Sequence, residues 1–237
     1  MYIDAATQTA NNAVLNAVLT GSTARTWKIL VTQILCSSRT LPPTGCLQYH
    51  TGTTGQMRSF NFLATSYQHL NEQYYKICIR REARYCRIGY TASSDPDSFK
   101  VSRNPTSYLA NTGEGGCGPD TLKIPEGSNN GDKTSCTNPT GTVPTVDFYC
   151  GGSLNCVTGK ANPSVIITSV SPLRVTKLSL ISYFLGTDYH SRWRLTSTLL
   201  RQALETEGSV STIIKSCVDQ SSRHREPHIT RCDKNEI

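Results

Sequence analysis

Tyr74-Tyr-Lys-Ile-Cys-Ile-Arg-Arg-Glu-Ala-Arg-Tyr-Cys-Arg-Ile-Gly-Tyr90 is the stretch of sequence that decides the fold. Two runs rich in Tyr and Ile flank a polar turn at residues 81–84, which predicts a β-hairpin centred on Glu82. In that register Cys78 lies opposite Cys86, and facing cysteines on antiparallel strands are close enough to form a disulfide. The sequence therefore predicts a hairpin held by a Cys78–Cys86 bridge. The alternative is two unpaired thiols in the same strand pair.

The cysteine content of the chain indicates an oxidising environment. Ten cysteines occur among 237 residues, and none forms a C-x-x-C pair of the kind found in zinc ribbons. An even number of cysteines in a strand-rich chain is typical of secreted proteins, so we expect an extracellular protein. No stretch approaches the roughly 18 apolar residues of a membrane span. The first residues do not read as a signal peptide, and we expect that the natural chain begins before Met1.

The rest of the chain alternates between strand patterns and turns. Residues 27–36 read as a buried strand, and Pro42, Pro43 and Gly45 then mark a domain boundary. Residues 120–124 alternate and precede a turn at residues 125–127. Residues 128–145, rich in Asn, Gly, Thr and Pro, predict a long loop. Beyond Lys177 the pattern changes, because Leu195, Leu199, Leu200, Ala203 and Leu204 form a helical stripe.

Several motifs in combination resemble the CUB-domain proteins of insects and other arthropods. They are Trp27-x-Ile-x-Val-Thr-Gln-Ile-x-Cys36, Pro43-x-Gly-Cys-Leu-Gln-Tyr49, Tyr75-Lys-Ile-Cys-Ile-Arg80, Cys117-x-x-Asp-x-Leu-x-Ile124 and Phe148-Tyr-Cys-Gly151. The resemblance implies an all-β, antiparallel two-sheet sandwich of jelly-roll type, stapled by disulfides. It divides the chain into 1–40, the last strands of a preceding truncated CUB-like domain, 41–177, a CUB-like domain, and 178–237, a divergent tail that is partly helical or irregular. We expect that this tail does not complete the sandwich.

The resemblance also implies disulfide partners. The third cysteine of the family bridges to a cysteine that precedes a glycine, which corresponds here to Cys117 and Cys150. A Cys136–Cys156 bridge is a further prediction. Cys36 and Cys46 flank the domain boundary, and their pairing stays open between each other and partners missing from the chain. Cys217 and Cys232 are expected to lack native partners if the tail is not native.

Neither catalytic nor metal-binding residues are expected. Cys150-Gly-Gly-Ser-Leu154 resembles a run near the start of trypsin-like proteases, but no His-Cys or Gly-Asp-Ser-Gly motif accompanies it, and a triad needs all its members together. A subset of CUB domains binds Ca²⁺ through clustered carboxylates, of which this chain matches Asp120 alone. Six to eight oxygen ligands are typical of Ca²⁺, so we expect no metal site and no cofactor.

The charge of the predicted hairpin suggests a ligand. The formal net charge is +7, and Lys76, Arg80, Arg81, Arg84 and Arg87 lie around one turn with a single acid. We take Arg80, Arg81, Arg84 and Arg87 as the candidate binding residues. A solvated turn without a partner is the alternative.

The resemblance and this charge together predict a function class. We expect a non-catalytic, extracellular interaction module for proteins or acidic glycans, with no nucleic-acid partner. Two alternatives stay open. One is a non-catalytic fragment of a secreted protease that carries CUB domains, and the other is a structural component of matrix or cuticle.

Overall fold

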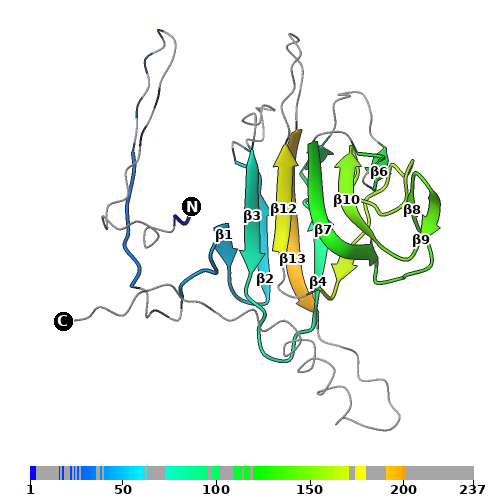
Figure 1. The fold of residues 1–237 in the computed structure, drawn as a ribbon, viewed down its shortest axis with the longest axis horizontal. Coiled ribbons are helices and arrows are strands. Elements are labelled where there is room, and N and C mark those ends of the chain that lie inside the picture. Colours follow the sequence, from blue (N-terminus) through cyan, green and yellow to red (C-terminus); the bar gives the residue numbers. More distant parts are fainter. Residues whose placement is uncertain are drawn as a thin grey trace.

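A computed structural model describes most of the region between residues 40 and 200. The described residues are 1–3, 16, 18, 22, 24, 26, 28–35, 38, 40–60, 62, 73–95, 98–101, 109–113, 115–117, 120–170, 174–179 and 191–200, of which 174–179, 191 and 192 are described as backbone. Within these residues the chain forms strands and no helix (Figure 1). The strands are β1 (Cys46–His50), β2 (Thr54–Arg58), β3 (Tyr74–Ile79), β4 (Arg87–Ala92), β5 (Phe99–Val101), β6 (Ala110–Thr112), β7 (Asp120–Asn129), β8 (Cys136–Asn138), β9 (Gly141–Val143), β10 (Val146–Gly151), β11 (Ile166–Thr168), β12 (Arg174–Ser179) and β13 (Ser191–Leu200).

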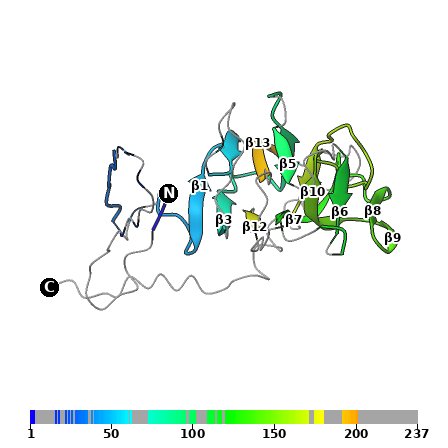
Figure 2. The ribbon, with the colours of Figure 1, turned by 90° about the horizontal axis from the view of Figure 1, so that it is seen from above.

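The strands form a two-layered antiparallel sandwich, as predicted. One layer has the order β1-β3-β12-β7-β10-β6, and the other has the order β2-β13-β4-β11. Figure 2 shows the layers from above, with β3 and β12 in one and β13 in the other. Among the described strands, every pairing is antiparallel except that of β1 with β3, which is parallel. In the described part of the chain no helix could span a bilayer.

Two long strands connect the layers. The first half of β7 pairs with β12, its pairing with β10 extends to Gly127, and its end at Ser128 and Asn129 pairs with β11 in the opposite layer. The bend falls at Pro125–Gly127, where Glu126 has a φ of 47°. A Cβ at Gly127 would clash with Tyr149 and Ile166, so glycine permits the close approach of the backbone. The predicted turn at residues 125–127 is therefore a bend within a continuous strand.

Strand β13 also pairs with strands of both layers. Ser191–Trp193 pairs with β5, which itself pairs with β10 of the first layer. In the second layer, residues 194–198 pair with β2 and residues 195–200 pair with β4. Trp193, Leu195, Ser197 and Leu199 are buried, whereas Thr196 between them is exposed. This period of two is that of a strand, so the helical stripe expected at residues 195–200 is wrong. The expectation that residues beyond 177 stay outside the sandwich is also wrong for 178–179 and 191–200. Residues 201–237 lie outside the described part.

The predicted hairpin of residues 74–90 is wrong, because its two strands lie in different layers. Strand β3 pairs with β1 and β12, whereas β4 pairs with β11 and β13. Ile77 and Ile88 are both fully buried, since each faces the core from its own layer. Burial of both strands in one core outweighs the local pairing that the turn suggested.

The disulfides follow this arrangement. Cys78 bonds Cys46 on the neighbouring strand, with 5.7 Å between their Cα atoms, and not Cys86 as predicted. Cys86 is also disulfide-bonded. Cys117 bonds Cys150 and Cys136 bonds Cys156, as predicted. The idea that Cys36 pairs with Cys46 is excluded by the Cys46–Cys78 bond.

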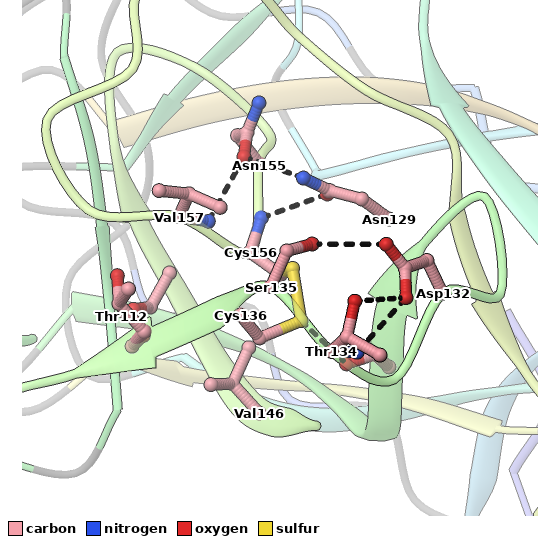
Figure 3. The surroundings of a disulfide bond; sticks show 12 residues. Thr112, Asn129, Asp132, Thr134, Ser135, Cys136, Val146, Asn155, Cys156 and Val157 are labelled. Atoms are coloured by element: carbon pink, nitrogen blue, oxygen red, sulfur yellow. Dashed lines mark hydrogen bonds between the residues drawn. A yellow bond between two sulfur atoms is a disulfide. The ribbon is translucent and has the colours of Figure 1, made fainter. Parts of the chain in front are cut away.

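The segment predicted as a long loop contains a second, small sheet. Strands β8 and β9 form a hairpin within residues 128–145, and Cys136–Cys156 ties it to the segment after β10. Figure 3 shows how two amides secure this bridge: Asn129 accepts a hydrogen bond from the Cys156 amide and donates one to Asn155. Asn155 in turn accepts from Val157, so the backbone on both sides of Cys156 is held.

Residues 28–35 do not form the buried strand that was expected for 27–36. They belong to no strand, and Leu30 and Val31 are 91% and 77% exposed. Residues 27 and 36 lie outside the described part. The assignment of residues 1–40 to a preceding domain stays a prediction.

Candidate functional site

The candidate basic residues lie on the segment that crosses from one layer to the other. Residues 80–86 leave β3, pass below the sandwich in Figure 1 and enter β4. Arg80, Arg81 and Arg84 are exposed on this crossover, whereas Arg87 is half-buried as the first residue of β4. The structure therefore brings three of the four predicted arginines together and assigns Arg87 to the sheet. We call residues 80–84 the basic turn.

Glu82 fixes the conformation of the basic turn. Its Oε1 atom accepts hydrogen bonds from the Gly52 amide and the Arg80 Nε, each at 2.9 Å, and forms an ion pair with Arg80 Nη2 at 2.9 Å. The Arg80 amide also donates to the His50 carbonyl at 2.8 Å. The basic turn is thus tied to the β1–β2 loop by side-chain and backbone contacts. Glu82 partly neutralises Arg80, which leaves Arg81 and Arg84 as the more available charges.

The contacts of Glu82 predict an acid-sensitive contribution to stability. The Gly52 hydrogen bond, followed by that of Arg80, lowers the pKa of Glu82 below its ordinary value. A lowered carboxyl pKa gives stability that is complete above the unfolded-state pKa and is lost as pH falls through the folded-state pKa. We therefore expect Glu82→Gln to destabilise the protein at pH 7 and to have a smaller effect in strong acid. Urea unfolding of both proteins at the two pH values measures the difference. An equal effect at both values would contradict it.

A groove lies beside the basic turn and was not predicted. Its volume is about 470 Å³, and it is lined by Met1, Tyr2, Gln48, Tyr49, His50, Arg58, Ser59, Phe60 and Phe62. Burial raises the pKa of Tyr49, against an opposing effect of the nearby Arg80. Burial also lowers the pKa of His50, which favours the neutral imidazole. The proximity of Arg80 to Tyr49 places the basic turn next to the groove.

Little in the amino-acid sequence indicates this groove. Tyr2 is far from Gln48 in sequence, and Phe60 enters the lining of the groove because it follows β2. The cluster of Tyr49 and His50 after Cys46 was the available signal, and it has no spacing that indicates a binding site.

The predicted absence of a metal site turns on Asp120. Asp120 is half-exposed at the start of β7. Among the residues that the structure describes, no three His, Cys, Asp or Glu side chains converge as metal ligands. The absence of a metal site stays a prediction.

Comparison with known proteins finds a family match. The family model described as the animal CUB domain matches residues 43–179, which is more than half of the chain. The match ends with β12 and does not include β13. No curated protein matches the chain. The narrower likeness to arthropod members stays a prediction.

Proposed function

The chain belongs to the animal CUB domain family, and from this premise we propose that it binds an acidic protein or glycan outside the cell through Arg81 and Arg84. CUB domains are generally extracellular, non-catalytic interaction modules. The disulfides Cys46–Cys78, Cys117–Cys150 and Cys136–Cys156 support secretion, because such bonds persist in oxidising compartments.

The observation that carries the proposal is the clamped conformation of the basic turn. Glu82 connects Arg80 to the Gly52 amide, so the backbone between the two layers is ordered before a ligand arrives. A preorganised surface loses less conformational entropy on binding. The guanidinium groups of Arg81 and Arg84 are exposed and planar, which suits two-point hydrogen bonding to carboxylate or sulfate.

Charge reversal of the basic turn tests this function. We expect Arg81→Glu/Arg84→Glu to elute from a heparin column at clearly lower salt than the wild type, because exposed ionic contacts act together and are screened by salt. Circular dichroism before and after thermal unfolding checks that both proteins are folded.

A matched variant separates local binding from overall charge. Lys133→Glu/Lys160→Glu reverses two exposed lysines elsewhere and changes the net charge by the same amount. We expect this variant to elute close to the wild type. Equal shifts for the two double variants would mean that heparin responds to the net charge, and the basic turn would then be an ordinary solvated turn.

A further inference from the structure

Strand β1 is at the edge of its layer and offers backbone groups for pairing. Among the described strands it pairs with β3 alone. The His50 carbonyl faces β3, since it accepts from the Arg80 amide at 2.8 Å. Backbone groups alternate in direction along a strand, so those of Leu47 and Tyr49 face the open edge. An edge of this kind can accept a further strand.

The chain already places one residue on this edge. The Tyr2 amide donates a hydrogen bond to the Leu47 carbonyl at 2.8 Å. The Tyr2 ring packs edge-on against the Tyr49 ring, with 6.4 Å between their centroids. Its neighbours Met1 and Ile3 are 72% and 61% exposed, whereas Tyr2 is half-buried. The segment is therefore held by one backbone hydrogen bond and one aromatic ring.

The groove next to this edge keeps an empty volume when Tyr2 is in place, and positively charged side chains lie close to it. Its volume of about 470 Å³ remains with Tyr2 in place as part of the wall. Gln48 spans it, donating to the Arg58 carbonyl at 3.2 Å while its oxygen lies 3.5 Å from the His50 Nε2. Arg58 is exposed and lines the groove, and Arg80 lies close to Tyr49. The aromatic floor and the two arginines are complementary to an aromatic side chain and a nearby carboxylate.

We propose that the β1 edge and its groove bind an extended peptide with a tyrosine beside an acidic residue, and that the segment carrying Tyr2 occupies this site in cis. The backbone of such a peptide pairs with Leu47 and Tyr49, and its ring packs on Tyr49. Because the internal segment competes, the site is only partly available in the free protein. The proposal does not depend on the binding function assigned to the basic turn.

A peptide that copies the internal segment tests the site. The probe is fluorescein-labelled Met-Tyr-Ile-Asp-Ala-Ala, the sequence of residues 1–6, and its binding is followed by fluorescence anisotropy. Tyr2→Ala removes the competitor, so we expect it to bind the probe about tenfold more tightly than the wild type, as the available fraction of the site rises. Adding Tyr49→Ala to Tyr2→Ala is expected to abolish that gain.

Two further comparisons make the test decisive. A probe that is N-methylated at its tyrosine lacks the donor for the Leu47 carbonyl and is expected to bind much more weakly. Lys133→Glu/Lys160→Glu, which reverses two exposed lysines with no role in either site, is expected to bind the probe like the wild type, which separates this site from the effect of overall charge. Equal binding by wild type and Tyr2→Ala, or by the two probes, would overturn the proposal. Loss of heparin binding in Tyr49→Ala without any peptide binding would instead assign the groove to a glycan and would also overturn it.

Discussion

Replacing Leu195 by aspartate is expected to abolish folding of the domain. Leu195 is fully buried at the centre of β13, where it is opposite Met57 of β2 and Ala92 of β4. Met57 itself is 1% exposed, so a carboxylate at position 195 would enter the core between the two layers. Burying an unpaired charge and losing the leucine packing together cost at least about 5 kcal/mol, which is comparable with the whole stability of an ordinary domain.

The adjacent residue gives the matched control. Thr196 belongs to the same strand but is exposed, so Thr196→Asp introduces the same charge on the opposite face. We expect Thr196→Asp to change the free energy of unfolding by about 0.5 kcal/mol or less, apart from its effect on strand pairing. Urea unfolding followed by far-ultraviolet circular dichroism measures both variants. A folded Leu195→Asp protein of near wild-type stability would mean that β13 is not an integral strand of the sandwich.

Removal of the Cys46–Cys78 disulfide is expected to have the second largest effect. The bond joins residues separated by 32 positions in sequence and ties the edge strand β1 to β3. For a closed loop of this length, the chain-entropy model gives a loss of about 4 kcal/mol in the free energy of unfolding. We expect Cys46→Ser/Cys78→Ser to lose that amount in urea unfolding under oxidising conditions.

Peptide mapping gives an independent chemical test of the Cys46–Cys78 bond. Peptide mapping of the wild type without reduction should recover the fragments of Cys46 and Cys78 joined to each other. Under reducing conditions the stability difference between wild type and the double variant should largely disappear, because the wild type then also lacks the bond. Recovery of Cys78 joined to Cys86 would restore the hairpin hypothesis and contradict the two-layer assignment of β3 and β4.

The sequence predicted the fold class well and the strand partners poorly. Resemblance to the CUB family led to the sandwich and to the Cys117–Cys150 bond, and Cys136–Cys156 was a further prediction. The structure contains both bonds. The hairpin at residues 74–90 failed because strand propensity identifies strands but not their neighbours. Both strands are mostly buried, and a buried strand has no polar face that would indicate its layer.

The failure at β13 has a different cause. Leu195, Leu199 and Leu200 fit a helical period, while Trp193, Leu195 and Leu199 fit a period of two, so the local pattern allowed both structures. Pairing with β2, β4 and β5 decided between them, and none of these strands is near β13 in sequence.

The candidate site was predicted only in part, because its local features are visible in the sequence and its long-range contacts are not. The basic turn is local, so its charge was visible in the sequence, and Arg80, Arg81 and Arg84 do lie on one exposed segment. The hydrogen bond from the Gly52 amide to Glu82, which fixes the basic turn, was not visible in the sequence, because the two residues are 30 positions apart. The groove depends on Tyr2, Tyr49 and Phe60 meeting in space, which no local pattern encodes.

The position of β13 in the chain also determines when the domain can fold. Strand β2 reaches its partner only after β13 has been synthesised, because Met57 pairs with Leu195. At ordinary rates of translation the ribosome needs on the order of 10 s to add the residues between them. During that interval β2 and β4 each lack the neighbour that covers one edge, and contacts of such long range also close slowly. Until β13 arrives, these edges of β2 and β4 stay open to pairing with other strands of the nascent chain.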